Sequence, residues 1–427
     1  MSPTFRAFGN RNYRVFAAGA AISNVGTWMG RVGQDWLVLT QLTDHSASAL
    51  GLVTGLQFLP MLLLAPWSGM IVDRFAKRRI VVVTQSVLAV TALLLAVLVL
   101  TGTVTLWHVY TLAFVQGVTT ALDVPARQTF VGEMVPPDLL SNAVALNSAS
   151  FNAGRLVGPA VAGLLIAAFG TGIAMLLNGL SFLPVVASLL VLRGAELRPA
   201  PVARGKGRIR EGLAYVRGRP DLKLVMALIF VLGTFGMNFQ ITMALMATTV
   251  FDKGPGEFGL LGSIMAVGSL AGALYAARRE RPRIRVLLLA LAGFTVATLL
   301  AALAPTYWTF AAALVPCGLT ALTAMTTANA LVQLSVDPSV RGRVMALYMA
   351  IFWGGTPLGA PLIGWLGDVA GPRWSIGVGT LAVGLALGVV AILVTRRENV
   401  VVSYQSNRRP RVRVDVESRT ALSPPVQ

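Results

Sequence analysis

The stretch GMIVDRFAKRRIVVVTQSVLAVTALLLAVLVL, residues 69–100, joins a short charged loop to a long apolar run. The apolar part, residues 80–101, is long enough to cross the hydrocarbon core of a bilayer, which takes about 20 helical residues. Lipid cannot hydrogen-bond to an open backbone, so an apolar run of this length has to be a helix. The stretch therefore predicts a membrane-spanning helix that follows a charged loop at the membrane surface.

The composition of the whole chain also indicates that lipid is its solvent. Of the 427 residues, 55% are apolar and only 12% are charged, whereas soluble domains carry about 25% charged residues. A soluble fold of this length would leave much of that apolar surface in contact with water. The single cysteine, Cys317, excludes a disulfide framework, and two histidines leave little material for a metal site. We expect no cofactor and no metal.

Eleven further runs have the same length and character, and none shows the ten-residue alternation of a β-barrel strand. The chain is therefore predicted to be an all-α polytopic membrane protein with twelve transmembrane helices. The expected spans are residues 14–39, 48–71, 80–101, 106–127, 142–168, 171–192, 222–250, 258–277, 286–304, 307–333, 343–367 and 374–395.

The Lys and Arg residues predict the orientation of these helices. Thirty-one of the 35 fall in segments on one side of the membrane, and both termini lie on that side. Because cytoplasmic loops carry the excess of Lys and Arg, both termini are expected in the cytosol, with the protein in the cell (inner) membrane. The net charge of +18 is then an orientation signal and an attraction to the lipid bilayer. No nucleic-acid partner is expected.

The two halves of the chain resemble each other at an offset of 201 residues. A duplicated six-helix unit is typical of transporters, whose halves rock about a central cavity. We therefore expect a six-helix bundle at residues 1–192, a basic cytoplasmic linker at 193–221, a second, pseudo-symmetric six-helix bundle at 222–397 and a disordered cytoplasmic tail at 398–427. The first copy contains Val131, Val135, Pro137, Ala145, Leu146, Phe151, Gly154, Gly158 and Gly163, which recur as Val332, Val336, Pro338, Ala346, Leu347, Phe352, Gly355, Gly359 and Gly364.

The charged loop carries the most specific motif of the chain. It resembles the signature Gly-x-x-x-Asp-Arg-x-Gly-Arg-Arg of the major facilitator superfamily, although Ala76 stands in place of the second glycine. With twelve helices in two halves, the resemblance covers nearly the whole chain and implies the fold of that superfamily. The matching residues are Gly69, Asp73, Arg74, Lys77 and Arg78.

The resemblance implies a gating role for this loop. In the superfamily the aspartate helps to close the cytoplasmic gate, which implies that Asp73 pairs with a helix end and with an arginine, for which Arg127 is the candidate. Asp123, four residues before Arg127, is assigned to the same gating network. The alternative is that the cations of the loop only set the topology.

A second motif lies in the fifth predicted helix. GRLVGPAVAG, residues 154–163, resembles the Gly-x-x-x-Gly-Pro-x-x-Gly element of proton-coupled exporters of the superfamily, through Gly154, Gly158, Pro159 and Gly163. Glycines at this spacing permit close helix packing, and proline frees a backbone carbonyl, so a packing role and a coupling role are both open. With its flanking residues the motif resembles the enterobactin-exporter-like, secretion-type group, which includes drug:proton antiporters. Ala113 stands where the superfamily usually has a helix-4 arginine, so no coupling role is assigned there.

Charged side chains inside the membrane are costly and so mark functional candidates. Asp35 is the predicted protonatable carboxylate, with Arg31 or Arg155 as its electrostatic partner. Arg31 and Asp35 are spaced i,i+4, so they can pair on one helix face, and a purely structural salt bridge is the alternative. The neutral and aromatic candidates for the substrate cavity, each with helix packing as the alternative, are Trp28, Gln34, Asn238, Gln240, Asn329, Tyr348 and Trp353.

Together these features predict a secondary transporter that acts as a monomer. It would export a small, partly hydrophobic compound, such as a drug, a siderophore or a secondary metabolite, by alternating access with proton antiport. An importer or facilitator of a small solute is the alternative. A membrane-embedded receptor or enzyme is a remote one, because it would need converging catalytic side chains or a sizeable extramembrane domain, and the outer loops are short and poorly charged. No Walker A, hydrolase or zinc-protease motif is present either.

Overall fold

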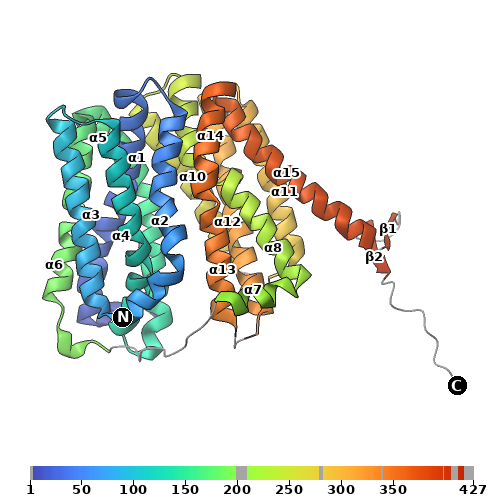
Figure 1. The fold of residues 1–427 in the computed structure, drawn as a ribbon, viewed down its shortest axis with the longest axis horizontal. Coiled ribbons are helices and arrows are strands. Elements are labelled where there is room, and N and C mark those ends of the chain that lie inside the picture. The colour runs from blue at the N-terminus through green and yellow to red at the C-terminus, as the bar shows by residue number, and fades with distance from the viewer. Residues whose placement is uncertain are drawn as a thin grey trace.

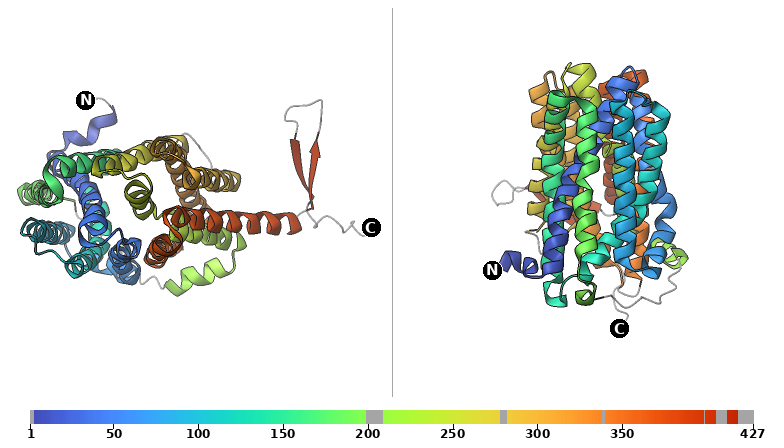
Figure 2. Two further views of the ribbon diagram at one scale, coloured as in Figure 1. Left: turned by 90° about the horizontal axis from the view of Figure 1, so that it is seen from above. Right: turned by 90° about the vertical axis from the view of Figure 1, so that its left-hand side faces the viewer.

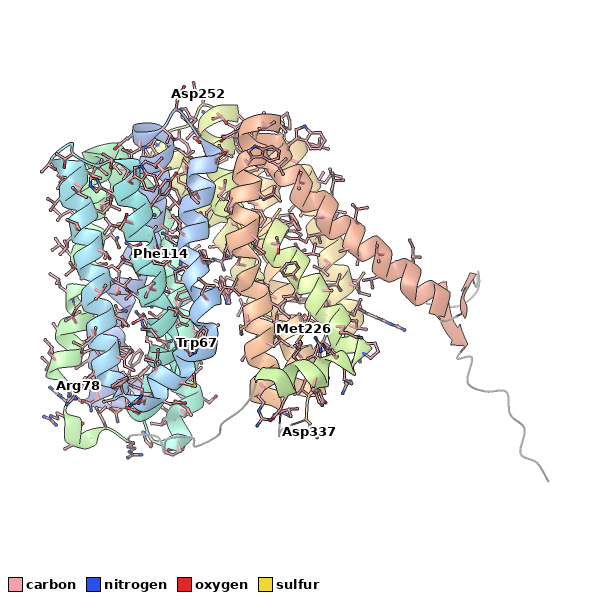
Figure 3. The ribbon with its side chains drawn as sticks, viewed as in Figure 1. Trp67, Arg78, Phe114, Met226, Asp252 and Asp337 are labelled. Carbon is pink, nitrogen blue, oxygen red and sulfur yellow. The ribbon has the colours of Figure 1, made fainter. Side chains whose placement is uncertain are left out.

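The computed structural model describes residues 3–198, 209–277, 282–337, 340–397, 399–404 and 412–417. Long helices stand side by side, with the N-terminal half to the left and the C-terminal half to the right in Figure 1. Seen from above they form a ring (Figure 2, left). Figure 3 shows Arg78 and Asp337 at the end of the bundle drawn lowest and Asp252 at the opposite end, and these are called the lower end and the upper end below.

The N-terminal half begins its helices at polar caps. The side chain of Asn10 accepts hydrogen bonds from backbone N–H groups of the first turn of α1, and that of Ser46 does the same for α2. The helices are α1 (Arg11–Leu37), α2 (Ala47–Arg74), α3 (Lys77–Leu100), α4 (Leu106–Glu133), α5 (Leu140–Ser181) and α6 (Leu183–Val191), with the short turns η1 (Pro3–Gly9), η2 (Val38–Leu42), η3 (Pro137–Leu139) and η4 (Gly194–Glu196).

The range of α5 contains a chain reversal at Gly170. This glycine has φ +82°, a left-handed conformation that side chains rarely adopt. Before the reversal, Gly154 and Gly158 approach Asn24 and Trp28 of α1 in parallel order. After it, the chain runs along α1 in the opposite direction, where Asn178 lies beside Gly30. The two predicted spans on either side of this glycine are therefore separate helices that cross in opposite directions.

Two predicted spans of the C-terminal half are broken rather than continuous. Residues 222–250 are interrupted around Met237 and Asn238, after two glycines in the sequence LGTFG, and residues 343–367 at Gly355. Glycine weakens a helix interior, which explains both breaks. The elements are α7 (Ile209–Arg217), α8 (Pro220–Val231), η5 (Leu232–Gly236), α9 (Phe239–Leu245), η6 (Met246–Val250), α10 (Pro255–Ala277), α11 (Ile284–Leu303), α12 (Tyr307–Ser335), α13 (Arg341–Gly354), α14 (Thr356–Ala370) and α15 (Pro372–Arg397).

By length and composition, nine segments of the described chain are suited to cross a membrane. One of them, Pro137–Val191, holds the two antiparallel helices around Gly170. Helices α1 and α4 are not among the nine, yet they match the other spans in length and pack against α5 and α2. Their polar side chains lower their hydropathy, and some of these, such as Asn24 and Asp123, are buried against protein partners. The expected twelve crossings are accounted for in this way.

The outside of the bundle is apolar, as a lipid-facing surface must be. Leu164, Leu289 and Leu385 each expose about two thirds or more of their surface, at 68%, 72% and 69%. Trp107 and Trp308 lie exposed in the first turns of α4 and α12, and tryptophan is enriched at membrane–water interfaces.

Two segments outside the six-helix bundles, the linker and the tail, contain regular secondary structure. Within the linker, α7 forms a short helix, and Glu211 of α7 pairs with Arg343 of α13; residues 199–208 lie outside the described part. Within the tail, β1 (Asn399–Tyr404) pairs antiparallel with β2 (Val412–Glu417). The structure thus differs from the expected disorder at these two strands, whose valines favour pairing, and the rest of residues 398–427 lies outside the described part.

The two halves pack tightly against each other toward the upper end. A Cβ atom added to Gly51 of α2 would lie 2.4 Å from the carbonyl oxygen of Ala360 in α14. One added to Gly259 of α10 would lie 2.2 Å from the carbonyl oxygen of Pro159 in α5. Only glycine lets two backbones approach this closely.

These contacts between the halves reach the middle of the bundle. There Ser263 of α10 donates a hydrogen bond of 2.6 Å to the carbonyl oxygen of Leu156 in α5. Toward the lower end, α2 diverges from α13 (Figure 1) and Trp67 of α2 is 54% exposed (Figure 3). In the described conformation the two halves are therefore in contact at the upper end and apart at the lower end.

Candidate functional site

Two arginines share one tryptophan ring in the middle of the bundle. The guanidinium carbon of Arg31 lies 4.8 Å from the centroid of Trp28, and that of Arg155 lies 5.6 Å from the same centroid. Each such cation–π contact contributes roughly 0.5–2 kcal/mol. Trp28 and Arg31 belong to α1 and Arg155 to α5, and the close approach of these helices at Gly158 brings the three residues together.

Further aromatic rings extend this group across both halves. Phe151 of α5 contacts Trp28 edge-on, with 5.7 Å between centroids, and Phe58 of α2 lies 5.8 Å from the Arg31 guanidinium. Phe58 also stacks on Trp353 of α13, in the other half, at 5.5 Å and an interplanar angle of 6°. Trp28, Arg31, Phe58, Phe151, Arg155 and Trp353 are called the central cluster below.

The central cluster carries an excess of positive charge. Among the described residues, neither Arg31 nor Arg155 forms an ion pair or a hydrogen bond. The expected contact between Arg31 and Asp35 is electrostatic and not a direct ion pair. Asp35 is 7% exposed, and no other described residue hydrogen-bonds to its carboxylate. The candidate for proton coupling thus lies buried one turn from Arg31, with which it interacts electrostatically but forms no ion pair.

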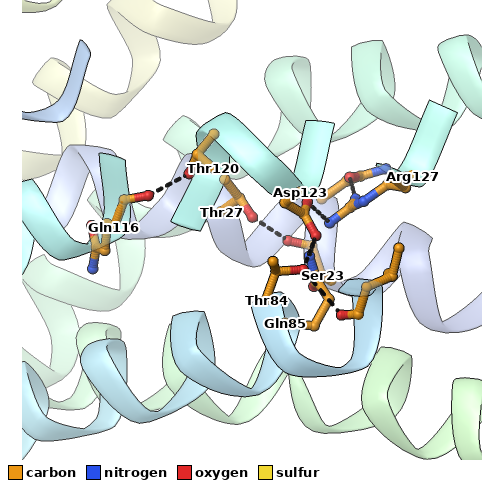
Figure 4. A network of polar contacts seen from close by, with 10 residues as sticks. Ser23, Thr27, Thr84, Gln85, Gln116, Thr120, Asp123 and Arg127 are labelled. Atoms are coloured by element: carbon orange, nitrogen blue, oxygen red, sulfur yellow. Dashed lines mark hydrogen bonds and ion pairs between the residues drawn. The ribbon is translucent and has the colours of Figure 1, made fainter. Parts of the chain in front are cut away.

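Asp123 stands in a different environment, a closed polar network between α1, α3 and α4 (Figure 4). Its carboxylate accepts hydrogen bonds from Thr84 Oγ1 at 2.6 Å and Gln85 Nε2 at 2.9 Å, and it pairs with Arg127 at 3.1 Å. Arg127 also donates to Asn24 Oδ1 at 3.4 Å. The network satisfies a buried charge on three sides, as burial requires. Asp123 and Arg127 therefore contact each other, as the gating hypothesis expected.

The charged loop between α2 and α3 does not reach this network. Asp73 is partly exposed, and within the described ranges its carboxylate forms no hydrogen bond or ion pair with another residue; Arg127, its expected partner, pairs with Asp123 instead. Arg78 instead donates to the carbonyl oxygens of Leu189 and Leu190 at the end of α6, at 2.8 and 3.0 Å. The remaining motif residues are Gly69, with nothing near its Cα, Arg74, which is exposed, and Lys77, which is buried in the first turn of α3.

The glycine motif of α5 serves two packing interfaces. A Cβ atom on Gly154 would lie 2.8 Å from the backbone of Asn24, so this part of the motif packs α5 against α1. A Cβ atom on Gly163 would lie 2.5 Å from the carbonyl oxygen of Pro255, so its other end packs α5 against α10 of the opposite half. Pro159 contacts the same helix through Gly259 and Gly262. The motif joins the two halves and positions Arg155 between its two interfaces.

Asp368 is a polar link between the halves that the sequence analysis did not single out. It lies near the end of α14, and its carboxylate accepts hydrogen bonds from the backbone N–H groups of Ala47 and Ser48, at 2.6 and 2.9 Å, and from Ser46 Oγ at 3.3 Å. A carboxylate at a helix N-terminus is stabilised by the unpaired N–H groups there. In the sequence, Asp368 is marked only as a single acidic residue directly after the predicted span 343–367.

The other substrate candidates lie outside the central cluster. Asn238 is buried inside the C-terminal bundle and donates to the carbonyl oxygen of Thr234 at 2.8 Å. Tyr348 is buried against α12, where its hydroxyl donates to Met325 at 3.4 Å. Two are more accessible: Gln240 is half-buried in α9, which contacts α1, α2, α10 and α14, and Asn329 accepts a hydrogen bond from Gln333. Gln34 is buried, and its Nε2 has no partner among the described residues.

The architecture defines the class of protein. The chain is similar to the solved structure of the nucleoside transporter NupG, with a TM-score of 0.72 over 90% of this chain and 99% of that one at 11% identity. It is also similar to a bacterial homolog of the human lysosomal transporter Spinster, solved inward-facing and occupied, with a TM-score of 0.70 over 93% and 98% of the two chains at 14% identity. These likenesses show the major facilitator fold.

The sequence then gives the family. The chain belongs to the transmembrane secretion effector family of the major facilitator superfamily, whose model matches residues 2–422. It is 29% identical to the multidrug efflux pump Tap of Mycolicibacterium fortuitum over 88% of this chain and 94% of that protein. It is 24% identical to the staphyloferrin A transporter of Staphylococcus aureus over 61% and 66% of the two chains. It is 23% identical to the enterobactin exporter EntS of Shigella flexneri over 86% and 89%.

This family consists of multi-pass membrane transporters of small molecules, not of enzymes, and it includes exporters of drugs and siderophores. The resemblance to the enterobactin-exporter-like, secretion-type group, inferred from the motifs, is confirmed.

Proposed function

We propose that this transporter exports a small, partly hydrophobic compound by alternating access, driven by protons that enter the cell. The observation that carries the proposal is the central cluster, which is built from both halves while the halves are joined at the upper end and separated at the lower end. A site shared by two bundles that touch at one end is what a rocking mechanism needs. Residues 1–192 and 222–397 are the proposed moving units.

The lower end is the proposed cytoplasmic end. The N-terminus and Arg78 both lie there (Figures 1 and 3), which agrees with the excess of Lys and Arg in the loops assigned to the cytosol. The described conformation is then inward-facing. A membrane-impermeant maleimide applied to intact cells tests this, because it should label Asp252→Cys and leave Arg79→Cys unlabelled, and the reverse pattern would invert the topology.

Asp35 is the proposed proton carrier. It is buried one turn from Arg31 of the central cluster, to which it is not bonded, so its charge influences the site where substrate binds. It would take up a proton while the site faces outward and release it inward after the halves have rocked. Asp123 is a poorer candidate, because Thr84, Gln85 and Arg127 already hold its charge.

Proteoliposomes with an imposed proton gradient test the coupling. Asp35→Asn should abolish gradient-driven transport and leave the thermal stability within a few degrees of the parent. The matched control is Asp44→Asn, an exposed acid beyond the end of α1, which should transport normally. Unchanged pH-dependent transport by Asp35→Asn would remove this residue from the mechanism.

The direction of substrate transport is tested with membrane vesicles of known orientation. An exporter accumulates substrate in inverted vesicles and extrudes it from right-side-out vesicles, whereas an importer shows the opposite pattern. A facilitator only equilibrates the two sides, whatever the gradient.

The motif loop has a proposed place in the same cycle. Asp73, whose carboxylate has no hydrogen bond or ion pair to another described residue in this conformation, would find its partners when the lower end closes, near the Asp123–Arg127 network. Closing that end would then open the upper one, because each half moves as a unit.

A further inference from the structure

We propose that the central cluster binds the anionic oxygen group of an aromatic or planar organic substrate, so that the exported compounds are organic anions and not cations. The inference rests on the proposed transport function and specifies its substrate class. Arg31, Trp28 and Arg155 would hold the anionic group, and the surrounding rings would hold the apolar part.

The charge of the site is the first argument. Two guanidinium groups lie near one tryptophan ring, at 4.8 and 5.6 Å from its centroid, and neither forms an ion pair in the described part of the chain. Asp35, one turn from Arg31, interacts with it electrostatically without a direct ion pair, so two cations are opposed by one carboxylate. Charges at this depth are normally paired. Cation–π contacts compensate for only part of that cost, and here both cations share one ring. A bound anion would supply the missing partner, whereas a cationic substrate would meet two like charges.

The hydrogen-bonding inventory is the second argument. Within the described residues, the indole Nε1 of Trp28 is buried and has no acceptor, and the guanidinium groups of Arg31 and Arg155 donate to no other residue. Nε2 of Gln34, one turn beyond Arg31 on α1 and 4% exposed, also lacks an acceptor. All of these unsatisfied groups are donors. A ligand that completes them must bring acceptor oxygens, as a carboxylate, a phenolate or a catecholate does, and the arginine fork suits two such oxygens.

The shape of the surroundings is the third argument. Phe151 is 47% exposed and Trp353 is 36% exposed, although both lie in the cluster and not in a mobile loop. Phe58 and Trp353 stack on each other across the two halves, at 6°, and Trp353 is the exposed ring of this pair. Aromatic faces favour planar apolar groups. The site therefore combines donors for an anionic group with a wall for a ring.

A charge series on one ring tests the proposal. The purified transporter in nanodiscs is titrated with salicylate, with its neutral analogue salicylamide and with the cation 2-hydroxybenzylammonium, and affinities are measured by saturation-transfer NMR without any proton gradient. Salicylate should bind at least tenfold more tightly than salicylamide, and the cation should bind most weakly. Equal affinities, absence of binding by all three compounds or preference for the cation would each overturn the proposal.

Variants assign the preference to the two arginines. Arg31→Gln and Arg155→Gln should each lower the affinity for salicylate about tenfold and leave that for salicylamide within about twofold. Arg31→Lys and Arg155→Lys, which keep the charge, should retain a preference for the anion, and Arg79→Gln at the lower end is the matched control. The melting temperature shows whether each Gln variant is folded. If both folded Gln variants still prefer salicylate over salicylamide, the anion site lies elsewhere and the assignment to the two arginines is refuted.

The binding readout separates this proposal from the proposed transport function. Preferential binding of salicylate without transport in any vesicle preparation would uphold the anion site and overturn the transport proposal. Proton-driven export of a cationic compound, together with a lack of anion preference, would do the opposite.

Discussion

Asp368 offers the sharpest quantitative prediction about the transport cycle. Its carboxylate on α14 accepts three hydrogen bonds from the N-terminal turn of α2, which belongs to the other half of the molecule. The bonds form only while the upper end is closed, so they stabilise the conformation described here relative to one open at that end. Asp368→Ala removes the carboxylate that accepts all three hydrogen bonds without disturbing the interior, because the side chain lies at the surface.

The size of the effect follows from known capping energies. Removing a helix N-cap acceptor costs about 0.5–2 kcal/mol, and a charge at a helix N-terminus contributes about 0.3–1 kcal/mol when exposed. We take about 1–2 kcal/mol for the whole interaction, since water screens part of it. That free energy corresponds to a change of roughly 5- to 30-fold in the ratio of the two conformations.

Spin labels across the lower end measure this ratio. The labels are attached to the substitutions Trp67→Cys in α2 and Met349→Cys in α13, which replace exposed side chains in opposite halves. The native Cys317 is buried and so is not a site for the label. Double electron–electron resonance should show a larger fraction of short distances, with the lower end closed, in the Asp368→Ala background. Asp252→Asn is the matched control, since it changes an exposed acid at the same end (Figure 3). Distance distributions for Asp368→Ala that coincide with those of the parent would refute the reasoning.

Two further predictions concern packing and buried charge. Gly259→Ala should push α10 away from α5 and lower the melting temperature by several degrees, because its Cβ would meet the Pro159 carbonyl oxygen at 2.2 Å. Gly256 has open space around it, so Gly256→Ala should change the melting temperature little. Equal effects of the two substitutions would contradict the packing argument. Asp123→Ala should destabilise the fold by about 3–5 kcal/mol, because it leaves Arg127 buried and without an ion pair. Asp73→Ala should keep the stability of the parent and reduce transport. Chemical denaturation measures the stability and vesicle uptake the transport, and normal stability of Asp123→Ala would exclude the network as a structural element.

Much of the fold was predictable because the bilayer constrains it so strongly. Runs of about 20 apolar residues must be helices in lipid, and this alone indicated α3 and α11 almost to their ends. The breaks at Asn238 and Gly355 were not predicted, because hydropathy does not register a local bend. The strand pair in the tail was missed because a polar, basic composition outweighed a short alternation of valines.

The candidate site was predicted in part, through its charges. Arg31, Arg155 and Asp35 stood out because ionisable groups are rare inside membrane helices. Phe58 and Phe151 did not, since a phenylalanine that lines a site and one that packs in a core give the same signal in an apolar run. Asn238 and Tyr348 were candidates for the substrate cavity, yet they are buried within the C-terminal half.

The solvent of this protein, its helical character and its relationship to a family could be predicted from the amino acids in order, because these depend on composition, run length and local motifs. Which charges are satisfied depends instead on how the helices pack. Asp123 has two partners on the neighbouring helix α3 and one, Arg127, on its own helix, while Arg31 and Arg155 share one tryptophan ring. The reason is geometric: glycines that are far from their partners in the sequence set how closely the helices approach, and that distance determines which side chains meet.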